Sequence, residues 1–89
     1  MKIKESFVLV RRDGQNFIEC TDKSNTLFNT SLSLNTSAAF LFRQLKKKPQ
    51  SKEDLLESLL DMFDVSTVLA LNDIDTFIKI LGKNGILEE

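Results

Sequence analysis

The change of pattern between residues 32 and 42, called the hinge below, constrains the fold of this chain more than any other feature. Up to Leu34, polar and apolar residues alternate with the period of a half-buried strand. Asn35 then begins three residues whose short side-chain oxygens suit the start of a helix. Residues 38–42 are all apolar and predict a buried helix. We therefore expect strands before the hinge and helices after it.

The chain before the hinge contains three candidate strands. Residues 7–12 and 16–21 are rich in strand-forming residues and flank Asp13-Gly14, a strong signal for a two-residue hairpin. Residues 27–34 form the third candidate, and one of its faces is small and polar, without lysine or proline. Exposed strand edges usually carry lysine or proline, which prevent pairing with other chains. This edge is therefore either covered by a helix or the C-terminus, or open to a partner.

Three helices are expected after the hinge. The first runs to about Lys46 and is stopped by Pro49, and the second opens at Ser51, which is followed by acidic residues suited to a first turn. The third begins at Ser66 and ends near Gly82 or Gly85. This order predicts an α+β fold, with a three-stranded antiparallel sheet followed by three helices, in one domain spanning residues 1–89.

The third helix carries two apolar strips. The broad strip, which suits packing on the sheet, consists of Ala70, Leu71, Ile74, Phe77, Ile78 and Leu81. Leu69 and Ile80 lie together off this strip, next to Thr76, and form a second, smaller one. A helix with a second strip often touches a second surface, although single exposed apolar residues are also normal.

The composition argues against catalysis. The chain has no histidine, tyrosine or tryptophan, and its three glycines are too scattered for a phosphate-binding loop. We therefore expect no catalytic residue, cofactor or metal site. The single cysteine, Cys20, fits a reducing, cytoplasmic setting, and no apolar run approaches the length of a membrane helix.

Charge is unevenly distributed along the chain. Residues 1–52 carry ten basic and four acidic residues, whereas residues 53–89 carry two basic and nine acidic residues. The second and third helices resemble a helix-turn-helix pair, which raises DNA binding as an alternative. However, the third helix carries Asp73 and Asp75 with Lys79 as its basic residue before Gly82, and a recognition helix should instead offer basic or amide groups.

The order and spacing of several short motifs resemble the coenzyme PQQ synthesis protein D (PqqD) family. The motifs are the hinge from Leu34 to Phe42, the helix start at residues 51–56, Phe63-Asp64-Val65, residues 73–78 and Gly85-Ile86-Leu87. The sequence departs from the family pattern at Ala38, where glycine is common, at Phe42, where tryptophan is frequent, and in the basic run 46–48.

The resemblance implies a winged-helix-like domain that serves as a non-enzymatic recognition element of ribosomal peptide modification pathways. Such a peptide chaperone binds the leader of a ribosomally synthesised precursor peptide and presents it to a modifying enzyme, often a radical SAM protein. The leader adds as a strand to the third strand and lies against the third helix. No nucleic acid and no membrane is implied as a partner.

Seven residues are expected to bind the peptide. Backbone groups of Thr30, Ser31, Leu32 and Ser33 would pair with the leader, because small side chains let a second backbone approach. Leu71, Asp75 and Ile78 would form the groove wall, since their flank borders the strip that packs on the sheet. The same open edge could instead serve self-association as a homodimer.

Overall fold

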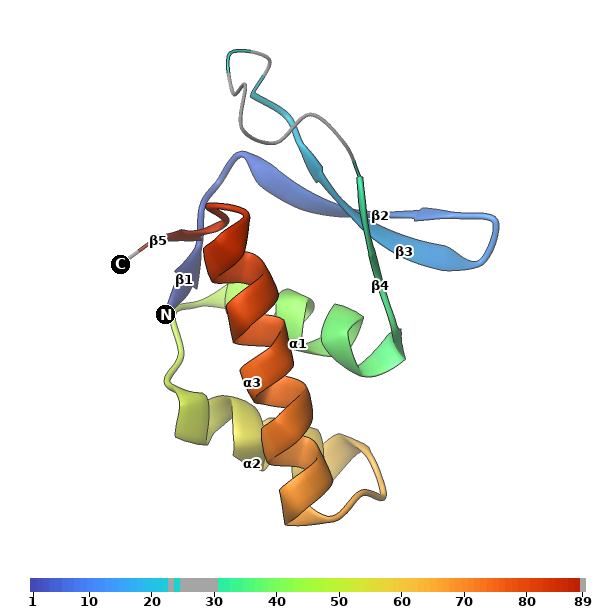
Figure 1. Ribbon diagram of the computed structural model, residues 1–89, viewed down its shortest axis with the longest axis vertical. Helices are drawn as coiled ribbons and strands as arrows, with labels where there is room; N and C mark the ends of the chain where they lie inside the picture. Colours follow the sequence, from blue (N-terminus) through green and yellow to red (C-terminus); the bar gives the residue numbers. More distant parts are fainter. Residues whose placement is uncertain (23, 25–30, 89) are drawn as a thin grey trace.

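The computed structural model describes residues 1–22, 24 and 31–88. A three-stranded antiparallel sheet in the order β2-β3-β4 is followed by three helices, and a separate pair, β1-β5, joins the two ends of the chain (Figure 1). The α+β fold predicted from the sequence is confirmed. The elements are β1 (Lys2–Ile3), β2 (Phe7–Arg12), β3 (Gln15–Cys20), β4 (Leu32–Leu34), α1 (Thr36–Lys47), α2 (Lys52–Met62), α3 (Thr67–Lys83) and β5 (Leu87–Glu88).

The β2–β3 hairpin forms where the sequence predicts it. Asp13 and Gly14 have φ angles of 52° and 78°, and positive values at both central residues define the turn type that matches the twist of a hairpin. Val10 lies opposite Phe17, and Leu9 lies opposite Ile18. Ile18 is fully buried toward the helices, so this face of the sheet forms part of the core.

The outer face of the sheet is covered by its own side chains. The guanidinium of Arg12 lies 5.0 Å from the centre of the Phe17 ring, and it forms a 2.5 Å ion pair with Glu19. Ser31 joins this group, because its hydroxyl accepts a hydrogen bond from Arg12 and donates one to Glu19. Phe17 is therefore shielded without a second layer of helices.

Each helix begins at a cap residue that the sequence offers, and of the three candidates 35–37 the first helix uses Asn35. Asn35, Ser51 and Ser66 accept hydrogen bonds from the backbone N–H groups of Ala38, Asp54 and Leu69. These caps fix where the helices start. Their apolar faces meet the inner face of the sheet in one cluster that includes Phe7, Phe42, Leu55, Leu59, Ile74, Phe77 and Ile86.

The β1–β5 pair was not predicted as strands. Lys2 lies opposite Glu88 and Ile3 lies opposite Leu87, beside the end of α3. Gly85, with a φ of 67°, turns the chain out of α3, and the buried Ile86 then enters the core. The chain after α3 thus reaches the core at Ile86 and enters a second, two-stranded sheet at Leu87.

Candidate functional site

The edge of β4 is the first component of the candidate site. β4 pairs with β3 on one side through Ile18–Leu32, Phe17–Ser33 and Asn16–Leu34. On its other side, no strand among residues 1–22, 24 and 31–88 pairs with it. In the described part of the chain, β4 is therefore an open edge. The C-terminal strand β5 does not cover it, because β5 pairs with β1.

The hydrogen-bond pattern of the sheet decides which backbone groups of β4 point outward. Antiparallel pairs alternate between bonded and non-bonded residues. The Thr21 N–H donates to the Ser6 carbonyl, so Ser6 and Thr21 form a bonded pair. Every second pair of the hairpin from there is also bonded, and Val10–Phe17 is one of these pairs. Phe17 thus bonds toward β2, so its partner on β4, Ser33, is a non-bonded residue. Ser33 consequently directs both its N–H and its carbonyl away from the sheet.

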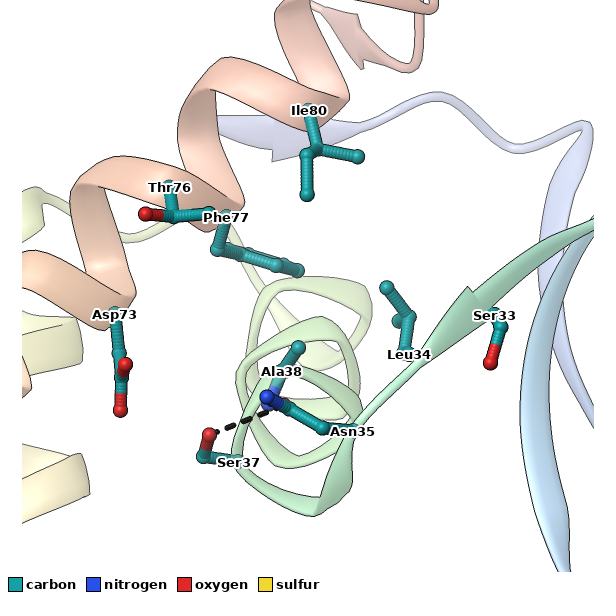
Figure 2. Close-up of a pocket in the computed structure, with 9 residues that line it drawn as sticks. All are labelled: Ser33, Leu34, Asn35, Ser37, Ala38, Asp73, Thr76, Phe77 and Ile80. Carbon is teal, nitrogen blue, oxygen red and sulfur yellow. Dashed lines mark hydrogen bonds between the residues drawn. The ribbon is translucent and has the colours of Figure 1, made fainter.

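A hollow lies between this edge and α3 (Figure 2). Its volume is about 160 Å³. We call it the β4–α3 groove, and it is lined by Ser33, Leu34, Asn35, Ser37 and Ala38 on one side and by Asp73, Thr76, Phe77 and Ile80 of α3 on the other.

The groove has an apolar floor and a polar rim. Leu34 and Phe77, which are 6% and 2% exposed, point toward each other across it, with Ile80 above them (Figure 2). Asp73 and Thr76 are exposed at the α3 rim. Asp73 is the charged member of this lining, and it has no ion pair among the described residues. The site therefore offers apolar contacts together with one uncompensated carboxylate.

The hinge holds the β4 side of the groove in place. The Asn35 carboxamide oxygen accepts 2.9 Å and 3.1 Å hydrogen bonds from the Ala38 N–H and the Ser37 hydroxyl. This cap fixes the angle between β4 and α1 directly beside Ser33 and Leu34. Ala38 is small, which leaves room between the start of α1 and Phe77.

The strand residues expected to bind peptide have different positions in the structure. Ser33 lines the groove, whereas Leu32 is half-buried and lies opposite Ile18. The Ser31 side chain is engaged on the outer face by Arg12 and Glu19. Thr30, like the expected strand segment 27–30, lies outside the described residues. Peptide contact by these residues stays a prediction.

The expected flank of α3 does not face β4. Leu71, Asp75 and Ile78 share the side of the helix opposite to Asp73 and Thr76, and Asp75 forms a 2.5 Å ion pair with Lys52 at the start of α2. None of these three residues lines the β4–α3 groove, and peptide contact by them stays a prediction. Both flanks border the buried strip. α2 packs along the flank that contains Asp75, and β4 lies beside the flank that contains Asp73 and Thr76.

The groove residues that sequence reasoning missed are Asp73, Thr76 and Ile80. The signal for them was the second apolar strip, in which Leu69 and Ile80 lie next to Thr76. In the structure, Ile80 borders the groove and Leu69 is 57% exposed. This strip was a better guide to the groove than the border of the main strip.

The described residues contain no cluster of three or more His, Cys, Asp or Glu side chains able to hold a metal ion. The carboxylates with shifted pKa values, Asp22 and Asp54, lie outside the groove lining. In both, hydrogen bonds from a neighbouring serine lower the pKa of the carboxyl. The groove thus offers shape, apolar contact and backbone hydrogen bonds.

Comparisons with known proteins find solved structures with the same architecture and a matching family model. Two solved structures share it over 99% of this chain: TbiB1 in complex with the TbiA(beta) leader peptide, and a lasso peptide synthetase B1 complexed with the leader peptide. Their TM-scores are 0.73 and 0.71, their identities are 17% and 18%, and 95% and 96% of their own chains are covered. No curated protein matches the sequence. The family model described as coenzyme PQQ synthesis protein D (PqqD) matches residues 7–87, and the chain therefore belongs to the PqqD family.

Proposed function

We propose that this protein binds the leader of a ribosomally synthesised precursor peptide in the β4–α3 groove and presents it to a modifying enzyme. Membership of the PqqD family supports this function, and both similar solved structures are complexes with leader peptides. A radical SAM protein is the expected enzyme. The role is that of a binding scaffold, and the chemistry belongs to the partner.

The observation that carries the proposal is the outward-facing backbone of Ser33 beside an apolar groove. A leader segment lying antiparallel or parallel to β4 would exchange hydrogen bonds with the Ser33 N–H and carbonyl. Its alternate side chains would then point toward Phe77 and Ile80, because successive residues of a strand point to opposite faces. Affinity would come from the ladder and selectivity from the groove.

The groove also indicates what the bound segment contains. Apolar side chains would cover Leu34 and Phe77, and a basic or hydrogen-bond-donating group would suit Asp73 at the rim. The same carboxylate argues against DNA binding, since it would face the phosphates of a duplex approached by α3. Pairing of two β4 edges in a homodimer would occupy the site that the leader needs.

No helix among the described residues is long and apolar enough to cross a membrane. A cytoplasmic setting, expected because the sequence has a single cysteine, stays a prediction.

The proposal can be tested with the product of a short open reading frame next to the one encoding this chain. The peptide is titrated into isotope-labelled protein, and amide shifts are followed by NMR. We expect the largest shifts at Leu32–Leu34 and at Asp73, Thr76 and Ile80. Saturable binding with shifts confined to other surfaces would contradict the proposed site, and DNA-dependent shifts on α3 would favour the alternative function.

A further inference from the structure

The opposite edge of the same sheet carries a second groove, formed by β2 and α1. It has a volume of about 400 Å³ and is lined by residues 8–11 of β2, Asn16 of β3 and residues of α1 that include Phe42. We call it the β2–α1 groove. It shares no residue with the β4–α3 groove, from which it is separated by β3.

The β2–α1 groove is strongly basic. Four of its lining residues are cations, namely Arg11, Arg43, Lys46 and Lys47, and none of its lining residues is acidic. In the described part of the chain, none of the four forms an ion pair. Arg43 and Lys46 donate hydrogen bonds only to neutral oxygens, the Asn16 carboxamide at 3.3 Å and the Glu5 carbonyl at 3.5 Å. Their charges are left without a counter-charge.

The backbone of β2 adds a second feature to this surface. The same alternation of bonded and non-bonded residues applies to β2, where Val8 and Val10 form their hydrogen bonds with β3. Leu9 and Arg11 therefore direct their N–H and carbonyl groups away from the sheet. Among the described residues, no strand lies beyond β2. This edge therefore offers a strand-shaped set of donors and acceptors directly beside four cations.

We propose that the β2–α1 groove binds a second polypeptide segment, extended and acidic, by strand addition to β2. Acidic side chains of the segment would face the α1 cations, and the alternate side chains would face Val8 and Val10 on the outer side of the sheet. Charge complementarity selects an acidic partner. The open edge of β2 selects a polypeptide over a nucleic acid, because its backbone donors and acceptors match those of another strand. Since the two grooves occupy opposite edges, the protein would hold this segment and a second peptide at β4 together.

The proposal can be tested with a fluorescent short peptide in which glutamates alternate with valines. A matched peptide with lysines in place of the glutamates serves as the control. We expect saturable binding of the acidic peptide alone, weakened as salt rises from about 0.05 M to about 0.5 M. NMR shifts should fall on residues 8–11, Arg43 and Lys47 and leave Ser33 and Thr76 unchanged.

Arg11→Glu combined with Lys47→Glu should lower the affinity by at least about tenfold, because both exposed charges are reversed. Lys79→Glu combined with Lys83→Glu changes the net charge equally outside the groove and should leave the affinity within about twofold. The milder pair Arg11→Gln and Lys47→Gln covers the case in which the first variant does not fold.

Three outcomes would overturn the proposal. Equal loss in both charge-reversed proteins would show a non-specific charge effect. Tighter binding of a duplex DNA probe, abolished by the Arg11 and Lys47 changes, would assign the groove to nucleic acid. A concentration-dependent dimer that the same changes dissolve would assign it to a second copy of this chain. None of these experiments uses a leader peptide, so their failure is distinct from failure of the β4 proposal.

Discussion

At the scale of single residues, Ser33 has the position most suited to strand addition. Its N–H and carbonyl point out of the sheet, and its small side chain leaves the approach to them open. Its neighbours Leu32 and Leu34 bond toward β3 instead. The sequence indicated the unprotected edge from its small polar residues, but it could not assign the outward position, which depends on the register with Phe17.

The substitution Ser33→Pro should weaken leader binding by at least about fivefold, because it removes the outward N–H that would bond to the leader strand. Ser33→Ala keeps that N–H and should bind within about twofold of the original protein. Isothermal titration with the leader peptide measures both. Equal affinity of the proline variant, with its amide spectrum still folded, would show that this donor is not used.

Asp54 illustrates a residue whose charge supports a helix start. Its carboxylate accepts a hydrogen bond from the Ser51 N–H, and this bond lowers the pKa of Asp54. A carboxyl with a lowered folded-state pKa stabilises the fold above its unfolded-state pKa, about 3.9, and loses that contribution as pH falls through the folded value.

Asp54→Asn should therefore lower the melting temperature at pH 7, and the difference from the original protein should shrink as the pH falls below about 3.9. Thermal melts followed by circular dichroism at several pH values provide the measurement. Asp61→Asn, an exposed change at the other end of α2, is the control and should show no such convergence. A constant difference at every pH would contradict the assigned role of the carboxylate.

At the scale of elements, the sequence was informative where the local signals were strong. The hairpin, the three helices and their caps follow from Asp13-Gly14, Asn35, Ser51 and Ser66. The strands β1 and β5 have two residues each, too short for a periodic pattern. The sequence could not decide which flank of α3 lines the β4–α3 groove, because both flanks border the buried strip and only the packing of α2 distinguishes them.

The assignment of this flank predicts that Thr76→Trp reduces leader binding at least about tenfold, because an indole at the rim would fill a hollow of about 160 Å³. Asn72→Trp places the same group on an exposed α3 position outside the groove lining and should bind normally. Asp75→Asn should also bind normally. Loss of binding in Asp75→Asn with none in Thr76→Trp would restore the flank first expected from the sequence.

At the scale of the whole molecule, the sheet presents two different edges to the solvent. The β4 edge borders a small apolar groove with Asp73 at its rim, and the β2 edge borders a basic groove. With β3 between them, the edges are roughly 10 Å apart. The sequence shows that basic residues are concentrated in its first 52 positions, but which cations share a groove depends on how α1 packs beneath β2. A fold of this kind can bring two polypeptides together.

Hydrogen exchange at the Ser33 amide tests strand addition most directly. In the free protein this N–H points to solvent, so it should exchange quickly, whereas the amides of Leu32 and Leu34 are already bonded within the sheet. At saturating leader peptide, we predict that exchange at Ser33 slows by at least about tenfold, with little change at its two neighbours. Saturated binding with unchanged exchange at Ser33 would show that the peptide does not add as a strand to β4.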